Sequence, residues 1–174
     1  MKITVDDLTG PEIAEFLTEH LRQMQAMSPP GSNHALDLDG LRAPGVVFWS
    51  VREGDDAEGA DGRGREGGEA GEAGEAGARV VACGALKRLD AEHGELKSMR
   101  TSTARRRSGI ASQLLGHIIG EAERMGLTRL SLETGSDEFF RPARRLYEKF
   151  GFTYCEPFAD YRPDPYSAFM TRVL

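Results

Sequence analysis

The sequence has 174 residues, a formal net charge of −6 and 21 glycines. One stretch, Glu53 to Ala78, contains only glycine, alanine, acidic residues and two arginines. Its nine acidic residues against two arginines give −7, which leaves +1 for the remaining 148 residues. Because a nearly neutral chain lacks the basic surface that binds phosphate backbones, we expect no nucleic-acid partner.

The apolar residues and the cysteines exclude further classes of protein. No apolar run approaches the ~18 residues that span a bilayer, and the first residues lack the apolar stretch of a signal peptide. Cys83 and Cys155 stand far apart in apolar, strand-like contexts, without the spacing of metal ligands. We therefore expect one cytoplasmic domain over residues 1–174, with two reduced buried thiols, no metal and no membrane contact.

The N-terminal part predicts a short strand followed by an amphipathic helix. Ile3 to Val5 alternates as a strand does, and Thr9-Gly10-Pro11-Glu12 has the form of a capping box with proline in the first turn. The helix is predicted to end before the breakers Ser28-Pro29-Pro30-Gly31, and a short helical turn is expected near Leu36 to Leu41. Apolar residues at three- and four-residue spacing form its inner face: Ile13, Phe16, Leu17, Leu21 and Met24.

Two predicted strands, at 46–51 and 80–86, flank the glycine-rich stretch. That stretch includes three consecutive Gly-Glu-Ala triplets from Gly68 to Ala76. Such a composition buries too little apolar surface to offset its ordering entropy. We predict a disordered hairpin loop at about 53–78, and a role as an acidic interaction tail is the alternative.

The C-terminal half alternates strands and helices. Gly126 stands where the cap of a helix belongs, directly after a long amphipathic segment. The order of elements predicts an α/β fold, a mixed sheet with helices on its faces and a β-α-β unit between about 95 and 134. The predicted strands are 95–101, 129–134, 152–155 and 168–173, and the predicted helices are 110–125 and 142–150.

The segment Arg106-Arg107-Ser108-Gly109-Ile110-Ala111 lies where a predicted strand meets an amphipathic helix. The first amides of a helix lack partners and lie at the positive end of its dipole, which together make an anion site. Gly109 lets the backbone approach a ligand closely, and the neighbouring arginines add positive charge. The pattern is neither the dinucleotide nor the P-loop signature, and alone it also fits a basic helix start on a solvent-exposed face.

With two further stretches, this segment resembles the GNAT superfamily of acyl-CoA-dependent N-acyltransferases. The segment itself is similar to the family's Gln/Arg-x-x-Gly-x-Gly/Ala motif, and Leu146 to Phe152 is similar to its Leu-Tyr-x-x-x-Gly-Phe segment. Glu95 stands just before the motif strand. Phe140 to Ala143 and Pro157 to Tyr161 resemble, more narrowly, a bacterial subgroup of uncharacterised acetyltransferases.

The resemblance implies a fold and a co-substrate. The fold is a GNAT-like mixed, largely antiparallel sheet of six to seven strands flanked by helices, with a splayed central strand pair at the cofactor site. Acetyl-CoA is implied as co-substrate, its pantetheine arm along the motif strand and its pyrophosphate on the first amides of the following helix. The implied cofactor-binding residues are Met99, Arg100, Thr101, Arg106, Arg107, Ser108, Gly109, Ile110, Ala111 and Ser112.

Transfer of an acetyl group to an amine needs a base, because a free amine with a pKa of about 10.4 is protonated at neutral pH. Glu95 is the candidate base and Tyr147 the candidate acid for the departing thiolate, with the Met99 amide as oxyanion donor. The alternatives are that Glu95 pairs with Lys97, expected on the same side of the strand as Glu95 and Met99, and that Tyr147 only packs. His34 and His93 are alternative bases.

The acceptor is open at the level of the sequence. The family often has an asparagine seven residues before the tyrosine, and Phe140 stands there, so a polar cofactor contact is lost or replaced by apolar packing. Arg100, Arg162 or Lys97 would recognise a carboxylate on the acceptor. We expect an N-acetyltransferase acting on a primary amine of a small molecule or a peptide. A non-catalytic acyl-CoA-binding regulator is the alternative. The sequence leaves open whether the chain forms a homodimer.

Overall fold

The computed structural model describes residues 1–27, 37–54 and 79–174. The predicted breaker cluster, His34 and the insert from 55 to 78 lie outside these ranges. Two 3₁₀ turns, Thr103–Arg105 and Glu138–Phe140, flank the site described below. The main elements are β1 (Lys2–Val5), α1 (Pro11–Met27), α2 (Leu38–Leu41), β2 (Val46–Glu53), β3 (Arg79–Arg88), β4 (His93–Thr101), α3 (Ile110–Arg124), β5 (Arg129–Gly135), α4 (Arg141–Lys149), β6 (Thr153–Tyr154) and β7 (Ser167–Val173).

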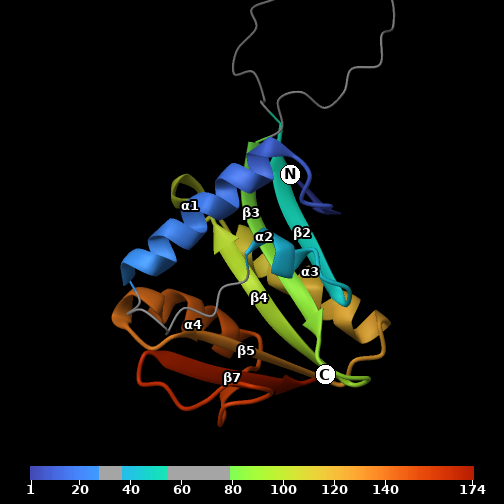
Figure 1. Cartoon of the computed structure of the whole chain (residues 1–174), viewed down its shortest axis with the longest axis vertical. Coiled ribbons are helices and arrows are strands. Elements are labelled where there is room, and N and C mark those ends of the chain that lie inside the picture. The colour runs from blue at the N-terminus through green and yellow to red at the C-terminus, as the bar shows by residue number, and fades with distance from the viewer. Residues whose placement is uncertain (28–36, 55–78) are drawn as a thin grey trace, which may run out of the picture.

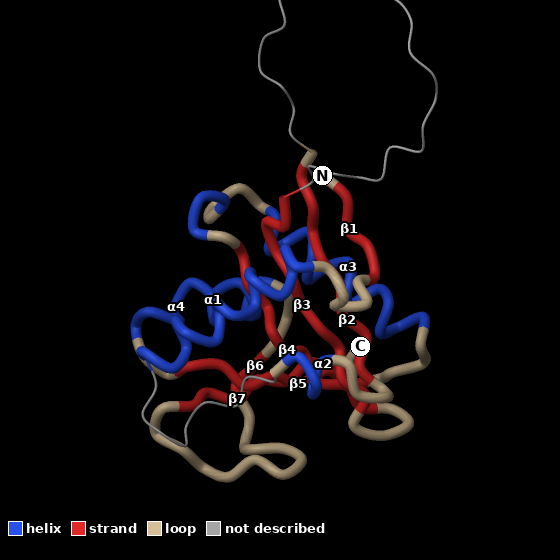
Figure 2. Tube along the Cα trace, turned by 45° about the horizontal axis from the view of Figure 1, so that its top comes forward, coloured by secondary structure: helices blue, strands red, loops and turns tan. Residues whose placement is uncertain are grey.

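Seven strands form one sheet in the order β1-β2-β3-β4-β5-β7-β6. Only β4 and β5 run parallel, joined by α3, and every other neighbouring pair is antiparallel. The prediction of a mixed, largely antiparallel sheet around a central β-α-β unit is therefore confirmed. Helix α1 crosses one face of the sheet and α3 lies behind the other, while the C-terminal end of α1 approaches α4 (Figures 1 and 2).

The two faces of the sheet bury two separate apolar clusters. On the α3 face, Leu114 and Ile118 are fully buried against Leu96 and Leu132. On the α1 face, a second cluster is made by Ile13, Leu17, Phe48 and Ala85 with their neighbours. The three- and four-residue spacing read from α1 and α3 thus marks their buried sides correctly.

The start of α1 differs from the predicted capping box. The helix begins at Pro11, so Thr9 stands one residue outside the capping position. The Thr9 hydroxyl donates to Asp7 Oδ1 at 2.6 Å, and the Thr9 amide donates to the same oxygen at 3.0 Å. The predicted capping box is therefore wrong, because Asp7 occupies the threonine in a local turn before the helix.

Strand β4 carries a bulge at Ser98. Cys83 of β3 pairs with Arg100 and Ala85 pairs with Lys97, so the one β3 residue between them faces two on β4. Ser98 has a φ of +52°, in the left-handed region that non-glycine residues rarely adopt. The Cys83 thiol donates to the Ser98 carbonyl at 3.2 Å, which ties β3 to the bulge.

The bulge changes which face of the sheet each later β4 side chain reaches. Met99 packs against the α3-side cluster, while the Arg100 guanidinium lies 4.9 Å from the ring of Phe16 on α1. Lys97 bonds Glu95 on the α1 side. The expectation that Met99 shares a side with Lys97 and Glu95 is therefore wrong, because simple alternation along a strand does not continue through a bulge.

Just before the bulge, β4 and β5 separate. Their parallel pairing runs from His93 opposite Arg129 to Leu96 opposite Leu132 and ends there, although β4 continues to Thr101 and β5 to Gly135. The edge of β4 from Lys97 onwards thus has no strand partner on the β5 side. This is the splayed strand pair that the resemblance predicts.

The insert connects two strands that pair with each other. Glu53, the last residue of β2, lies opposite Arg79, the first of β3, and its carboxylate also contacts Arg105 Nη2 at 2.7 Å.

Cys83 and Cys155 are free thiols, and the described residues contain no His, Cys, Asp and Glu cluster suited to a metal ion. Within the same residues, no helix is long and apolar enough to cross a bilayer.

Candidate active site

A cavity of about 960 Å³ opens where β4 and β5 part. Its walls come from the C-terminal half of α1, the end of β4, the turn before α3, the end of β5, and α4. It therefore brings together the predicted cofactor residues from separate parts of the chain. Those that line it are Met99, Arg100, Thr101, Arg106, Arg107, Gly109, Ile110, Ala111 and Ser112, and Tyr147 lines it as well.

The turn into α3 leaves the first amides of the helix available to a ligand. Gly109 is the capping residue with a φ of +84°, and no side chain bonds to the helix start. Arg107 also adopts a positive φ, of 65°. Successive amides in such conformations form a concave anion site, which the helix dipole strengthens. This geometry fits a pyrophosphate.

Ser108 is the predicted cofactor residue that does not line the cavity. Its hydroxyl donates to the Arg105 carbonyl at 2.6 Å and so holds the turn closed on itself. Arg106, in contrast, lies at the cavity wall with its guanidinium 5.8 Å from the ring of Phe139. The side chain of Ser108 therefore stabilises the turn, while Arg106 adds positive charge beside the helix start.

Tyr147 reaches the cavity from α4. Its side chain is buried, and its ring packs edge-on against Phe152 with centroids 5.9 Å apart. Burial raises the pKa of the Tyr147 phenol well above its usual value, and the charge of Glu133 raises it further. The phenol therefore carries its proton at neutral pH, as a group that protonates the departing thiolate must.

Glu95 lies behind the cavity wall. Its side chain is 2% exposed, and its Oε1 accepts from the Tyr161 hydroxyl at 2.5 Å and from Lys97 Nζ at 2.9 Å. Lys97 also donates to the Tyr161 hydroxyl at 2.8 Å, which closes a buried three-membered network. Lys97 lines the cavity and Glu95 does not. The ion pair with Lys97 is thus present, and the role of Glu95 as base stays a prediction.

Several cavity residues were not singled out from the sequence. Glu133 lines the cavity from β5 and accepts a hydrogen bond from the Ser167 hydroxyl at 2.7 Å. A signal for it existed, because ligands gather at the carboxyl ends of parallel strands and Glu133 follows the buried part of β5. Helix α1 contributes His20 and Gln23, for which the sequence held no such signal, and Met24, which the apolar spacing had placed on the inner face of the helix.

Phe140 takes the place of the family's asparagine and closes against Gly135 at the end of β5. A Cβ built on Gly135 would stand 2.1 Å, 2.3 Å and 2.7 Å from three carbons of the Phe140 ring. Both residues line the cavity. The Phe140 ring thus packs against Gly135, and the loss or replacement of a polar cofactor contact at this position stays a prediction.

The other candidates from the sequence lie elsewhere. The His93 ring bonds the Ser131 hydroxyl through Nε2 at 2.7 Å, outside the cavity lining. Arg162 is exposed and does not line the cavity either. Neither residue is positioned to act at the splayed strands.

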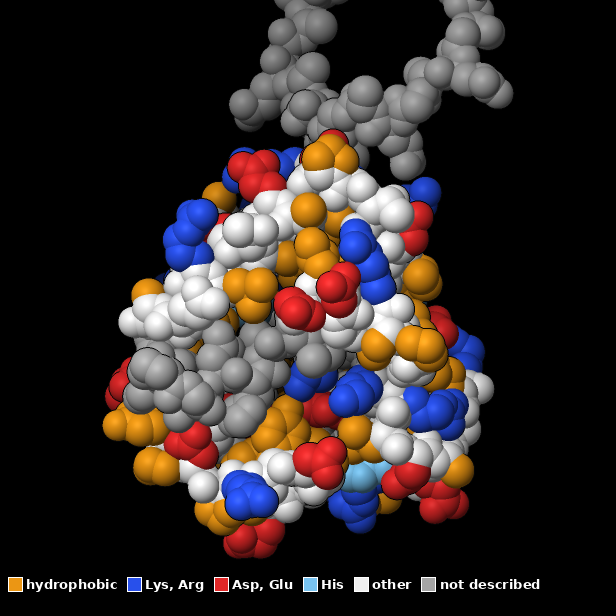
Figure 3. Space-filling model, viewed as in Figure 1, with side chains coloured by type: hydrophobic (Ala, Val, Ile, Leu, Met, Phe, Trp, Pro, Cys, Tyr) orange, Lys and Arg blue, Asp and Glu red, His pale blue; other side chains and the backbone are white. Residues whose placement is uncertain are grey.

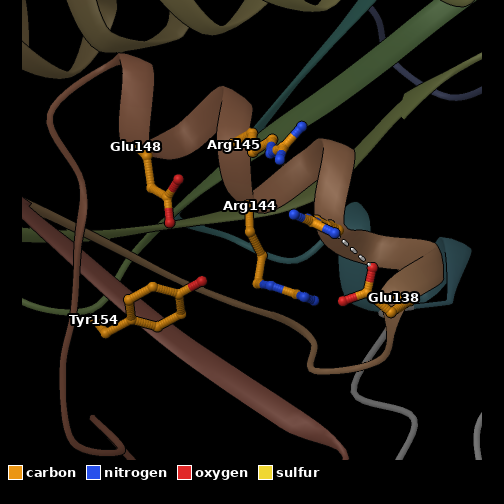
Figure 4. Close-up of a pocket in the computed structure, with 6 residues that line it drawn as sticks. Glu138, Arg144, Arg145, Glu148 and Tyr154 are labelled. Atoms are coloured by element: carbon orange, nitrogen blue, oxygen red, sulfur yellow. Dashed lines mark hydrogen bonds and ion pairs between the residues drawn. The ribbon is translucent and has the colours of Figure 1, made fainter.

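A second, smaller hollow of about 430 Å³ lies on the outer side of α4. Figure 4 shows Arg144 and Tyr154 on one side of the helix, with Arg145 extending in another direction. Arg145 also lines the larger cavity, and Arg141 pairs with Glu138 at 3.1 Å. The charged character of this hollow contrasts with the mixed polar and apolar lining of the cavity between β4 and β5.

An open strand edge that leads to an uncapped helix start, with a buried tyrosine beside it, defines an acyl-CoA-binding α/β domain. Residues 38–152 match the acetyltransferase (GNAT) family, and the chain belongs to this family. It is an acetyl-CoA-dependent N-acetyltransferase. The family suggested by the three sequence motifs is thereby confirmed.

Relatives of known sequence match the chain along nearly its full length. It is 52% identical to the uncharacterised N-acetyltransferase YsnE of Bacillus subtilis, over all of both chains. It is 45% identical to the uncharacterised N-acetyltransferase YedL of Escherichia coli, over 99% of this chain and 94% of that one. It is 35% identical to the IAA acetyltransferase of Azospirillum brasilense, over 93% and 90%.

Solved structures share the fold. An acyl-CoA N-acyltransferase from Klebsiella pneumoniae superposes with a TM-score of 0.67 at 22% identity, covering 99% of this chain and 97% of that one. A GNAT acetyltransferase from Elizabethkingia anophelis with acetyl-CoA bound gives 0.57 at 15% identity, over the same shares. That structure holds acetyl-CoA on the same fold, in agreement with the co-substrate of the family to which this chain belongs.

Proposed function

We propose that this protein acetylates a primary amine of a small molecule by direct attack of the amine on the thioester of acetyl-CoA. The observation that supports this most strongly is the single cavity in which the uncapped start of α3, the open edge of β4 and Tyr147 meet. Holding both substrates there makes a covalent enzyme intermediate unnecessary. Acetyl-CoA supplies the activated acetyl group, and the residues of the chain supply position and proton transfer.

The acceptor amine must lose a proton, and two carboxylates stand near its route. Glu133 lines the cavity and takes the proton directly, or through one water, in this proposal. Glu95, the base predicted from the sequence, does not line the cavity and is linked to it through Lys97, whose Nζ donates to Glu95 Oε1 at 2.9 Å. Removing the carboxylate that serves as base should flatten the acid limb of the pH profile of kcat/KM. Removing the other carboxylate should leave the acid limb in place.

Departure of the coenzyme requires a proton on its thiolate, and Tyr147 donates it in this proposal. Burial keeps the phenol protonated, so the donor is ready at any pH at which the amine is reactive. The Met99 amide, next to the bulge, stabilises the oxyanion that develops on the acetyl group. The proton taken from the amine then returns to Tyr147 through solvent.

The walls of the cavity favour a small acceptor over a protein segment. Helices α1 and α4 line it from two sides, and the part of its volume of about 960 Å³ that acetyl-CoA leaves free is suited to a small molecule. One relative, at 35% identity, is an enzyme whose name specifies IAA rather than a protein as acceptor. Both observations support a low-molecular-weight acceptor for this chain.

A thiol-release assay with acetyl-CoA and a panel of amines and peptides tests this proposal, with calorimetry of acetyl-CoA binding alongside. We expect sub-millimolar binding and turnover on at least one small amine. Binding without turnover on any member of a broad panel would instead support a regulator that senses acyl-CoA. Turnover on peptides alone would refute the small-molecule acceptor.

A further inference from the structure

Three basic side chains were candidates for recognising an acidic acceptor, and the structure separates them. Lys97 Nζ is held by Glu95 at 2.9 Å and by Tyr161 at 2.8 Å, so its charge already has a partner. Arg162 is exposed and lies outside the cavity lining. Arg100 lines the cavity from β4, on the face covered by α1, the face turned to the viewer in Figures 1 and 3.

Arg100 holds a buried guanidinium nitrogen without a partner. Its Nη1 is buried and has no hydrogen-bond partner among the described residues, and its guanidinium stacks 4.9 Å from the ring of Phe16. Burial lowers the pKa of this guanidinium, yet an arginine keeps its charge at neutral pH. Arg100 as a whole is half-buried, but a buried donor atom without a partner is costly, which favours a site completed by an acceptor on a ligand.

Glu19, the acidic residue whose charge acts on Arg100, is not its counterion. Glu19 on α1 raises the pKa of Arg100 through space, but its two carboxylate oxygens bond Arg22 at 2.9 Å and Gln23 at 2.8 Å. No salt bridge joins Glu19 to Arg100 within the described residues. The charge of Arg100 is therefore left for a molecule in the cavity.

The α1 side of the cavity adds polar groups without adding a second positive charge. His20 lines it, and burial together with the charge of Arg100 lowers the pKa of His20 to about 4. At neutral pH the imidazole is uncharged and presents one N–H donor. Gln23 lines the same part of the cavity. The α1 wall thus gives Arg100 neutral polar neighbours, while the other cations that line the cavity within the described residues lie on β4, on the turn before α3 and on α4. The charge of Arg106 also lowers the pKa of Arg100.

We propose that the Arg100 side chain, with His20 beside it, binds a carboxylate of the acceptor, so that the acceptors are amino acids or similar amines that carry a carboxylate. This inference rests on the proposed function and narrows its substrate class. The planar guanidinium pairs with a carboxylate through two parallel hydrogen bonds. In the proposed function the coenzyme lies along the open edge of β4 toward α3, whereas the Arg100 side chain leaves the strand toward Phe16 of α1.

Matched acceptor pairs test the inference by turnover. The panel consists of the proteinogenic α-amino acids, the short ω-amino acids and the carboxamide of each, which differs only in the charged group. For the wild type we expect kcat/KM about 10- to 100-fold higher for the acid than for its carboxamide, because a charge-assisted pair is lost. Arg100→Gln should abolish this preference, mainly through KM, and Arg100→Lys should keep part of it.

Two further measurements separate ligand binding from a structural role. Since Arg100 Nη1 has no partner in the described protein, Arg100→Gln should leave Tm unchanged or raise it. Arg100 is also one of the predicted cofactor residues, so acetyl-CoA Kd is measured for the same variant and the acid preference is compared at saturating acetyl-CoA. Arg22→Gln is the matched control, because Arg22 is an exposed arginine on α1 that pairs only with Glu19 in the described structure. Equal loss on acid and carboxamide at saturating acetyl-CoA would overturn the inference.

Product binding tests the same site without any turnover. N-acetyl amino acids and their amides are titrated into the protein saturated with coenzyme A, and heat is measured. A tighter Kd for the acids that Arg100→Gln removes would support the carboxylate site even if no amine in the panel is acetylated, a result that would count against the proposed function alone. Absence of a charge preference in both assays would refute the inference.

Discussion

Substitution of Gly135 by alanine should disturb the cavity through one contact. The new Cβ would stand 2.1–2.7 Å from three carbons of the Phe140 ring, distances at which the ring must move. The φ of Gly135 lies outside the left-handed region, so alanine meets no backbone strain and the cost is that of overpacking. The ring can escape mainly into the cavity, which both residues line.

The magnitude follows from typical costs of overpacking, about 1–3 kcal/mol. For a chain of this size, that corresponds to a fall in Tm of roughly 2–12 °C. If acetyl-CoA must push the ring back on binding, the same free energy weakens its Kd by about 5- to 160-fold. Differential scanning calorimetry gives Tm, and isothermal titration with acetyl-CoA gives Kd.

A double-mutant cycle with Phe140→Ala isolates the contact. Without the ring, the Cβ has room, so Gly135→Ala should cost less than about 0.5 kcal/mol in the Phe140→Ala background. Equal costs of Gly135→Ala in both backgrounds would refute the reasoning. So would a Gly135→Ala variant with unchanged Tm and unchanged acetyl-CoA Kd.

The remaining predictions concern the acid, the anion site, the insert and a buried histidine. Tyr147→Phe should lower kcat by about 100-fold and leave acetyl-CoA Kd within twofold, and an unchanged kcat in this variant would remove the acid role. Because burial raises the pKa of Tyr147, the wild-type kcat should show no loss from this phenol up to about pH 10. Arg106→Glu with Gly109→Glu should weaken acetyl-CoA binding at least tenfold by calorimetry, because charge and bulk enter the uncapped helix start; unaltered binding would move the phosphates elsewhere. Deleting residues 55–77 removes eight acidic residues and two arginines, which brings the net charge from −6 to zero. This deletion should leave acetyl-CoA Kd unchanged, and loss of binding would make the insert part of the site. Burial lowers the pKa of His20 to about 4, so the unfolded chain binds more protons than the folded one between about pH 6.5 and 4. The free energy of unfolding therefore falls as the pH drops through that window. His20→Gln should remove about 2 kcal/mol of this loss at pH 5, as measured by urea titration.

The elements that the sequence predicted are those with strong local signals. The spacing of Ile13 and Leu17, the cap at Gly126 and the breakers after Met27 each act over a few neighbouring residues, and α1 and α3 end within a residue or two of expectation. Strand β6 is shorter than expected, only Thr153–Tyr154, because its pairing with β7 and not its composition sets its length.

The features that escaped prediction depend on contacts between distant residues. The bulge at Ser98 arises from the register between β3 and β4, which no single strand encodes. Tyr161 reaches Glu95 across 66 positions of the chain, and the bond exists only once β4 and the segment before β7 are packed together. For the same reason His20 became a cavity residue only when α1 was placed over β4.

The site itself divides in the same way. The turn around Gly109 and the position of Tyr147 could be read from motifs, and both line the cavity. Whether Glu133 or Glu95 is the base could not, because that depends on which carboxylate faces the space left by the parting strands. Glu95 is buried behind Lys97 because of packing on both sides of β4, and the sequence of one strand does not reveal that packing.

The bulge in β4 also bears on how such enzymes diversify. Mutation replaces side chains and leaves the peptide backbone in place, so a co-substrate held by the strand edge and by helix amides tolerates most changes of sequence along β4. The side chain of Arg100 projects from the same strand toward α1. On the inference drawn above, a single substitution at this position changes the preferred acceptor and leaves the backbone groups that would hold acetyl-CoA in place.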